Sequence, residues 1–230
     1  MNSNCNNTDK IEVSILLAGL GDLSHQIQSI KNANATYNYE LIVCSDLKQN
    51  GCDVFLPDTG TSVSAYNEMF KISKGSYIIC LPGTVAACSN LFIVVDMLKR
   101  KEEAGEKIIL TSSNPDGHYC LIPPWAAEAA GLPSHPRPQI IRFPAFSRKT
   151  IYEHFDGVIF AESFKHHWVD NWLGTYCALI GENVKESVIR NINTLPHTSI
   201  TKDDAYDRKI YEKLCESFKN DRKYNIMITI

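Results

Sequence analysis

Two glycines and an acidic residue follow the first two strongly apolar segments of the chain. Gly19-Leu20-Gly21 comes directly after the apolar run 11–18, and Asp46 stands just beyond a second run, 40–44. A glycine pair between a buried strand and a helix, with an acidic residue further on, is typical of the start of a dinucleotide-binding fingerprint. Ser24 occupies the third glycine position, so the match is partial. A plain turn and a nicotinamide-cofactor site both remain open.

A second group of residues able to do chemistry lies between 166 and 172. Asp170 stands between Trp168 and Trp172. A carboxylate can take the proton of a hydroxyl group within hydrogen-bonding reach, and aromatic faces are good platforms for sugars. The alternatives are a solvent-facing helix acid and two tryptophans of the core.

The same segment carries two histidines. His166 and Asp170 are four residues apart, so on a helix both can face the same way. Together with His167 and His197 they form a candidate metal-binding cluster. The alternative is a hydrogen-bonded or surface histidine pair without a metal.

Apolar strand-like runs alternate with helical patterns through the first half of the chain. Strands are expected at 11–18, 40–44, 54–56, 76–81 and 107–111, and helices at 23–34, 62–73 and 89–101. This alternation predicts an α/β domain with a mainly parallel sheet. Ligands of such sheets bind at the carboxyl ends of the strands. The residues at those ends are Ala18-Gly19, Ser45-Asp46 and Pro82-Gly83-Thr84.

The second half of the chain begins with an irregular, proline-rich stretch at 115–144. A strand is expected at 140–143 and helices at 148–155, 164–180 and 202–219. Apolar residues at helical spacing predict that the last helix packs on one face, through Tyr206, Ile210, Leu214 and Phe218. Residues 1–10 are polar and Asn-rich, which predicts a disordered tail before a single domain at 11–230.

The order of these segments resembles family 2 glycosyltransferases, which have the GT-A fold. The resemblance rests on the runs VSILLAGLGD, YNYELIVCSD, AYNEMFKISKGSYIICLPG, FPAFSRKTIYEHFDGVIFAESFKHHWVDNWLGTY and LPHTSITKDDAYDRKIYEKL. It covers roughly residues 11 to 215. It implies a Rossmann-related α/β fold with a mixed, mainly parallel sheet flanked by helices. It also implies a nucleotide-sugar-binding half at 11–115 and an acceptor-side half at 116–220.

The resemblance further implies an activity. The enzyme would move a sugar from a UDP- or GDP-type nucleotide sugar to a hydroxyl of a carbohydrate or protein acceptor, with inversion. Asp46 would bind uracil or ribose groups, and Ala18-Gly19 would let the nucleoside approach the backbone. Asp170 would activate the acceptor hydroxyl. The residues Asn67, Lys74 and Arg148 would also serve the nucleotide sugar, although a helix-surface amide is the alternative for Asn67.

The sequence departs from this family at the turn after 76–81. There the family carries an Asp-x-Asp motif that holds Mg²⁺ or Mn²⁺ against the diphosphate, and this chain has Pro82-Gly83-Thr84. Such metals require hard oxygen ligands, and Thr84 alone does not replace two acids. Three interpretations stay open: metal-independent transfer, another metal cluster that includes His197, or a non-catalytic module that binds a nucleotide sugar or a partner. The cations available for metal-independent transfer are Arg137, Arg142, Arg148 and Lys202.

Composition excludes several other classes. The chain of 230 residues has 23 basic and 26 acidic residues, a formal net charge of −3, which argues against a protein that grips nucleic acid. No apolar run reaches the ~18 residues that a membrane span requires. The eight cysteines form no CxxC pair, and no signal peptide is evident, so reduced thiols and a cytoplasmic location are expected.

Overall fold

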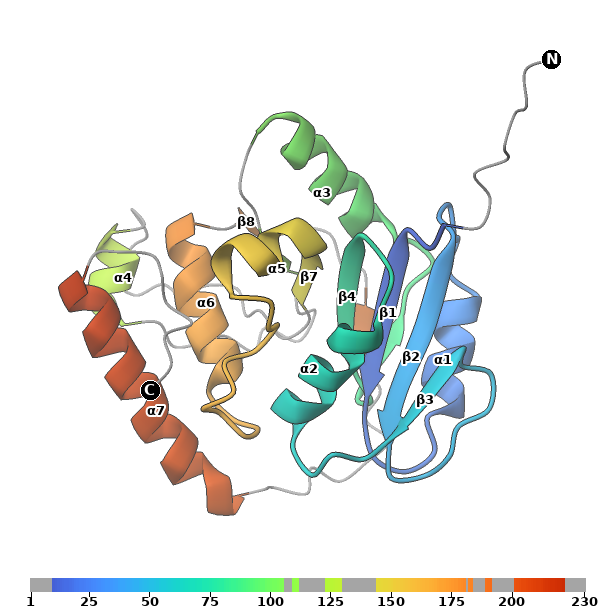
Figure 1. Cartoon of the computed structure of the whole chain (residues 1–230), viewed down its shortest axis with the longest axis horizontal. Coiled ribbons are helices and arrows are strands. Elements are labelled where there is room, and N and C mark those ends of the chain that lie inside the picture. The colour runs from blue at the N-terminus through green and yellow to red at the C-terminus, as the bar shows by residue number, and fades with distance from the viewer. Residues whose placement is uncertain are drawn as a thin grey trace.

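The computed structural model of the chain describes residues 10–105, 109–111, 123–129, 144–180, 182–183, 189–191 and 201–221. The strands are β1 (Val13–Ala18), β2 (Tyr39–Ser45), β3 (Val54–Pro57), β4 (Tyr77–Pro82), β5 (Val85–Ala87), β6 (Ile109–Thr111), β7 (Pro144–Ser147), β8 (Glu182–Asn183) and β9 (Ile189–Asn191). The helices are α1 (Ser24–Lys31), α2 (Ser62–Ile72), α3 (Ile93–Glu103), α4 (Pro124–Ala129), α5 (Arg148–His154), α6 (Val169–Ile180) and α7 (Thr201–Asp221). Figure 1 shows the sheet with helices on both of its faces.

The main sheet of the described chain has the strand order β3-β2-β1-β4-β7-β6-β8. β1 runs parallel to both β2 and β4, and β2 runs parallel to β3. β7 is antiparallel to its neighbours β4 and β6. The expected α/β fold with a mixed, mainly parallel sheet is therefore confirmed.

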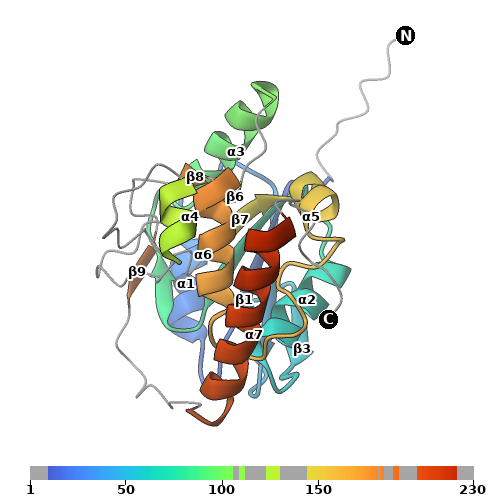
Figure 2. The same cartoon turned by 90° about the vertical axis from the view of Figure 1, so that its left-hand side faces the viewer.

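Each face of the sheet is covered by its own core. Leu16 of β1 belongs to a core that α2, α5, α6 and α7 complete, whereas Ile15 and Leu17 belong to a core on the opposite face, completed by α1 and α3. Successive side chains of a strand point to opposite faces. This is why a strand buried on both faces has a mainly apolar sequence, as Val13–Ala18 does, with Ser14 as its one polar residue. Figure 2 shows α4, α6 and α7 side by side on one face.

Several expected boundaries differ from the structure. The strand expected at 140–143 lies outside the described residues, and β7 occupies 144–147 immediately after it. α6 begins at Val169 rather than at Phe164, because residues 165–167 give their N–H groups to an acid of α7. The sequence did not predict the short elements α4, β5, β8 and β9, because segments of so few residues show no periodic pattern. Most of the expected tail, 1–9, also lies outside the described residues, and the division into two halves stays a prediction.

No helix in the described ranges combines the length and the apolarity needed to cross a membrane.

Candidate functional site

The carboxyl ends of three parallel strands meet at one edge of the sheet. Ala18 lies in register with Cys44 of β2 and with Pro82 of β4. The N–H of Gly83 donates to the carbonyl of Ala18 at 2.7 Å, which joins the turn after β4 to the end of β1. Figure 1 shows the arrowheads of β1 and β2 at the end of the sheet where α2 begins. We call this the carboxyl edge.

Gly19 and Gly83 are in backbone contact at the carboxyl edge. A Cβ atom on Gly19 would lie 2.8 Å from the Cα of Gly83, and a Cβ on Gly83 would lie 3.0 Å from the Cα of Gly19. Atoms that close cannot both stay in place. The two positions need glycine because the strand ends approach each other, a reason that holds without any ligand.

The loop after β1 is held by side chains from the loop after β2. Gly21 has φ +75° and donates its N–H to Oδ1 of Asp46 at 2.7 Å. Nε2 of Gln49 donates to the carbonyl of Gly21 at 2.8 Å, and Oε1 of Gln49 accepts the N–H of Leu23 at 3.0 Å. Gln26 adds a hydrogen bond to the carbonyl of Gly83. This edge of the protein is therefore ordered by its own contacts.

Asp46 is exposed at the carboxyl edge. The hydrogen bond from the N–H of Gly21 lowers the pKa of Asp46 below its usual value, because it stabilises the charged form. Two exposed leucines occupy the same two loops, with Leu20 49% and Leu47 53% exposed. The edge thus presents a charged carboxylate in loops that also expose apolar side chains.

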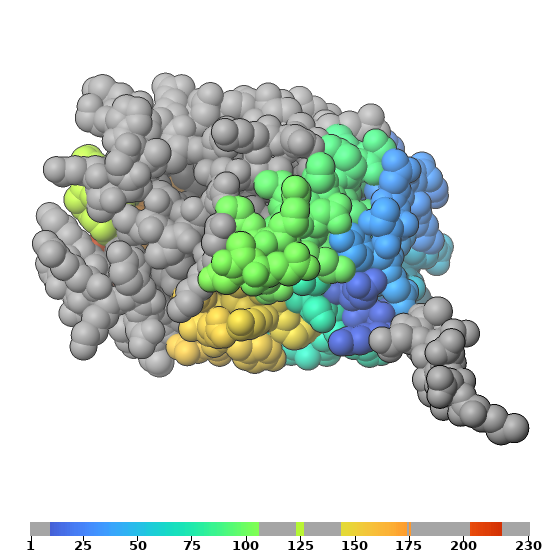
Figure 3. All heavy atoms as spheres, turned by 90° about the horizontal axis from the view of Figure 1, so that it is seen from above, coloured from blue at the N-terminus to red at the C-terminus, as the bar shows by residue number. Residues whose placement is uncertain are grey.

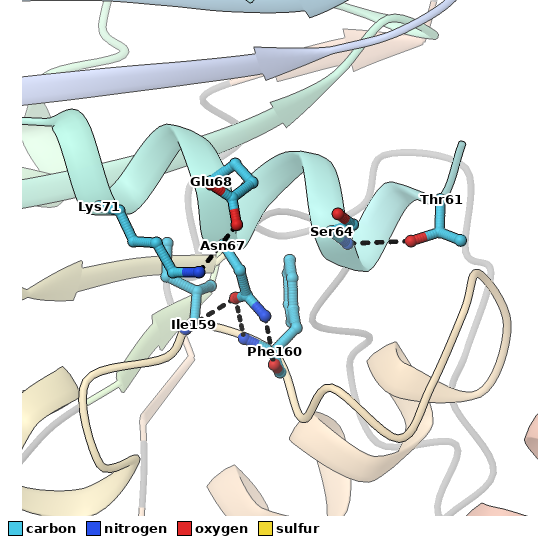
Figure 4. A network of polar contacts seen from close by, with 7 residues as sticks. All are labelled: Thr61, Ser64, Asn67, Glu68, Lys71, Ile159 and Phe160. Atoms are coloured by element: carbon cyan, nitrogen blue, oxygen red, sulfur yellow. Dashed lines mark hydrogen bonds and ion pairs between the residues drawn. The ribbon is translucent and has the colours of Figure 1, made fainter. Parts of the chain in front are cut away.

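The segment before α6 is joined to the start of α2. Nδ1 of His166 accepts the N–H of Ser62 at 3.2 Å, and the hydroxyl of Ser62 donates to the carbonyl of Lys165 at 3.3 Å. Thr61 caps α2 by accepting the N–H of Ser64, as Figure 4 shows. The thiol of Cys44 donates to the carbonyl of Pro57, the last residue of β3, after which the chain leads to α2. The segment before α6 is therefore linked, through the start of α2, to the carboxyl edge.

Asp207 of α7 accepts three backbone N–H groups of this segment. The distances are 2.9 Å from Lys165, 2.9 Å from His166 and 2.7 Å from His167. The Asp207 side chain is fully buried. Sequence reasoning missed this residue, although it continues the helical stripe of Tyr211, Leu214 and Cys215, all of which are buried.

The buried face of α7 agrees with the expected one at Ile210 and Leu214 and differs from it at Tyr206. Tyr206 was expected to pack, and it is 47% exposed. Its neighbour Asp207 faces inward instead. The physical reason is that three unpaired N–H groups of the segment before α6 require an acceptor, and a carboxylate satisfies all three.

The structure gives different surroundings to Trp168, Asp170 and Trp172. Trp172 is buried in the core, so one of the two aromatic residues takes the alternative role. Trp168 donates its indole N–H to Oδ1 of Asp204 at 2.9 Å and stacks near Tyr211, with ring centroids 5.3 Å apart. Asp170 lies in the first turn of α6 and accepts the N–H of Asn171. Its role as a base stays a prediction.

Asn67 is not at the carboxyl edge surface. Its Nδ2 donates to the carbonyl of Phe160 at 2.8 Å, and its Oδ1 accepts the N–H groups of Ile159 and Phe160 at 3.1 and 3.0 Å. Figure 4 shows these three bonds between α2 and the segment after α5. The amide is buried and occupied by the protein's own backbone. It is neither the nucleotide contact nor the surface amide considered from the sequence.

Lys74 and Arg148 lie at the opposite edge of the sheet. The N–H of Lys74 donates to Glu40, near the start of β2. Nε of Arg148 donates to the carbonyl of Gly75 at 2.7 Å, and its Nη2 donates to the carbonyl of Ser73 at 2.9 Å. Figure 3 views this side of the molecule from above, where α3 and α5 reach the surface. A strand of six residues separates the two edges by roughly 15–20 Å. The expectation that these two cations serve the same site as Asp46 is therefore not supported.

The remaining sequence candidates are Arg137, Arg142, His197 and Lys202. Arg137, Arg142 and His197 lie outside the described residues, and Lys202 lies in the first turn of α7. Within the described ranges, no three or more His, Cys, Asp or Glu residues are grouped as a metal site requires. His166 of the candidate metal cluster uses its Nδ1 to accept the N–H of Ser62.

Known structures resemble this arrangement, whereas no family model and no curated protein matches the sequence. S. aureus TarS 1-349 in complex with UDP-GlcNAc has a TM-score of 0.55 and 11% identity, over 83% of this chain and 61% of that one. The chain has the fold of GT-A glycosyltransferases. A second likeness is mannosyltransferase PcManGT from Pyrobaculum calidifontis in complex with GDP-Man and Mn²⁺, with a TM-score of 0.51 and 11% identity, over 94% of this chain and 66% of that one.

The structural matches cover a larger share of this chain than of the proteins it resembles. This GT-A chain spans less than two thirds of the length of either structure. S. aureus TarS 1-349 in complex with UDP is matched in the same way, over 78% of this chain and 60% of that one, with a TM-score of 0.50. At 11% identity these likenesses concern the fold.

Proposed function

We propose that the chain is a glycosyltransferase that moves a sugar from a UDP- or GDP-type nucleotide sugar to a hydroxyl of a carbohydrate or protein. The observation that carries this proposal is the GT-A fold with an ordered carboxyl edge at Ala18–Gly21, Asp46 and Pro82–Thr84. The solved structures that share the fold are complexes with UDP-GlcNAc, with UDP, or with GDP-Man and Mn²⁺. We further propose that the protein works in the cytoplasm.

The donor would bind at the carboxyl edge. The charged carboxylate of Asp46 can accept hydrogen bonds from ribose hydroxyls or base N–H groups. The exposed side chains of Leu20 and Leu47 are available for apolar contact with the base. Because the loop after β1 is already held by Asp46 and Gln49, binding would cost little further ordering.

The chemical step would be a single displacement with inversion. A base accepts the proton of the acceptor hydroxyl, the hydroxyl oxygen forms a bond to the anomeric carbon, and the bond from that carbon to the diphosphate oxygen breaks. We assign the base to Asp170, at the start of α6. The segment that precedes α6 is hydrogen-bonded to the start of α2, at the side of the molecule that carries the donor edge.

The leaving diphosphate must be stabilised by positive charge or by N–H groups. Pro82-Gly83-Thr84 supplies no carboxylate for a metal ion. We propose that cations of the chain, among them Arg137, Arg142 and Lys202, and backbone N–H groups serve the diphosphate.

A second candidate function is a GT-A module that binds a nucleotide sugar or a partner without transferring the sugar. The absence of a carboxylate from Pro82-Gly83-Thr84 favours it. The partial glycine pattern and Asp46 also fit an NAD(P)-dependent oxidoreductase, which no further observation favours.

The decisive experiment is an assay of the full chain with a panel of UDP- and GDP-sugars and a mixture of glycan acceptors. Release of the nucleoside diphosphate and calorimetric binding are both measured, with Mn²⁺ and with EDTA. Turnover that survives EDTA supports metal-independent transfer. Binding without turnover supports the second candidate. Neither binding nor turnover with any donor overturns both.

Two variants locate the donor site and the base. Asp46→Asn is expected to weaken donor binding about tenfold, because the charged acceptor is lost. Asp156→Asn is the matched control, since Asp156 is an exposed acid with φ +49° that asparagine also tolerates. Asp170→Asn is expected to leave donor affinity unchanged and to lower turnover at least a hundredfold. Unchanged turnover of Asp170→Asn removes Asp170 from the base role.

A further inference from the structure

The residue before α6 has a backbone conformation that a bulky side chain rarely adopts. Trp168 has φ +60°, and the N–H of Val169 donates to the carbonyl of His167 at 2.7 Å. A hydrogen bond that spans two residues across a positive φ defines a γ-turn of the rare, strained kind. Such strain persists only where the surroundings enforce it, and it is found most often at functional sites.

Contacts from α7 enforce this turn. The carboxylate of Asp207 accepts the N–H groups of the three residues that directly precede Trp168. Asp203 pairs with Nζ of Lys165 at 3.0 Å, and Asp204 accepts the indole N–H of Trp168 at 2.9 Å. The buried Asp207 makes the bonds that hold the backbone itself, whereas the other two acids hold side chains.

The turn decides where α6 begins. The apolar pattern of the sequence is compatible with a helix from Phe164 onward, but the helix starts at Val169, directly after the turn. Asp170 is therefore in the first turn of α6. A change in the turn at Trp168 would shift the start of the helix and the carboxylate of Asp170 with it.

The same segment also contacts the first half of the chain. His166 accepts the N–H of Ser62, and Lys165 accepts the hydroxyl of Ser62, so the start of α2 holds the segment from the other side. Asp170 follows His166 by four residues, a separation of at most about 14 Å along the chain. The segment 165–168 is thus fixed between α7 and α2.

We propose that Asp207 is a positioning residue, which holds the strained turn at Trp168 and thereby sets the position of Asp170 relative to the start of α2. The inference rests on the proposed function, in which Asp170 accepts the proton of the acceptor hydroxyl. Asp207 itself touches no substrate. Its effect should appear in the chemical step and not in donor binding.

The test compares Asp207→Asn with Glu212→Gln. Both changes remove one negative charge from α7 without changing the size of the side chain, but Glu212 is exposed and pairs with Arg208 of the same helix. For Asp207→Asn we expect kcat to fall at least tenfold per folded molecule, with the donor KM changed less than twofold. Glu212→Gln should behave as the wild type. A wild-type kcat in folded Asp207→Asn overturns the proposal.

A second readout does not depend on activity. In ¹H–¹⁵N spectra, the amide signals of Asp170 and Asn171 should move in Asp207→Asn and stay in place in Glu212→Gln. If they stay in place in both variants, the proposal is wrong even if the wild type transfers sugar. If they move and the wild type transfers no sugar with any donor, the proposed function is wrong and the positioning of Asp170 stands.

A third measurement covers the case in which Asp207→Asn does not fold. Hydrogen exchange on the wild type should show the amides of residues 165–167 protected to the same extent as the second turn of α7, which contains Asp207, because one carboxylate joins them. Asp207→Glu, which keeps the charge, should fold and retain part of kcat. Unprotected amides at 165–167 overturn the proposal.

Discussion

The carboxylate of Asp46 accepts the backbone N–H of Gly21 at 2.7 Å, although 25 residues separate them in the chain. The bond joins the loop after β1 to the loop after β2. Gln49 of the loop after β2 also holds the loop after β1, since it forms hydrogen bonds both to the carbonyl of Gly21 and to the N–H of Leu23. The two loops at the carboxyl edge therefore behave as one unit.

The hydrogen bonds between these loops predict the effect of Gln49→Ala. Loss of the buried amide removes its bonds to the carbonyl of Gly21 and to the N–H of Leu23, which costs about 1–3 kcal/mol of unfolding free energy. Because the loop loses its order, donor affinity should also fall, by about tenfold. Urea denaturation and calorimetry measure the two effects. The control is Gln28→Ala, an exposed glutamine of α1 bonded to Asn32, which should change neither.

Asn67→Ala should destabilise the fold without weakening the donor site in the folded protein. The loss of three buried hydrogen bonds to Ile159 and Phe160 predicts a cost of about 2–4 kcal/mol. Glu68→Gln is the neighbouring control, since Glu68 forms an exposed pair with Lys71 that contributes at most about 0.5 kcal/mol. A large loss of donor affinity in stably folded Asn67→Ala, without a loss of stability, would return Asn67 to the nucleotide site.

The variant Arg148→Lys tests whether the two edges of the sheet have different roles. The lysine cannot reproduce the bonds of the guanidinium to Ser73 and Gly75, so a loss of about 1–2 kcal/mol is expected. Donor affinity should stay at the wild-type value, because Arg148 lies at the amino ends of the strands. Lys149→Ala, at the next residue, has an exposed side chain paired with Glu153 and serves as the control. Weaker donor binding in Arg148→Lys alone would contradict this placement.

The stability of the folded protein should decrease at acid pH because His166 takes up a proton. Burial, the main cause, lowers the pKa of His166 below its usual 6.5, and His167 adds to this, while Asp203 and Asp207 oppose it. The unfolded chain therefore binds a proton on this residue more readily than the folded chain. The stability is fully present above pH 6.5 and decreases as the pH falls from that value through the lower pKa of the folded protein.

Denaturation at several pH values between 5 and 8 tests this prediction. His166→Asn should show a weaker decrease, since an amide oxygen can accept the N–H of Ser62 without titrating. His25→Asn, at an exposed position of α1, should keep the wild-type dependence. Equal pH dependence in the wild type and in His166→Asn would show that His166 does not carry the effect.

The fold class could be predicted because its signals are local. A strand buried on both faces is mainly apolar, so 11–18 and 40–44 are recognisable without knowledge of their neighbours, although they contain the buried polar residues Ser14 and Glu40. The alternation of such runs with helical patterns then predicts parallel strands and the edge at which Ala18, Asp46 and Pro82 lie. The antiparallel β7 could not be placed in the same way, because its four residues carry no distinctive period.

The roles of the polar residues were decided by the tertiary structure. An amide such as Asn67 can satisfy a ligand or a backbone equally well, and only the approach of Phe160, 93 residues away, selects the backbone. Arg148 has the chemistry of a phosphate ligand, but it faces Ser73 and Gly75 at the amino edge. Asp207 belongs to a helix rich in charged residues, yet it is buried against the N–H groups of 165–167. Residue type sets which hydrogen bonds are possible, and distant parts of the chain determine which of them form.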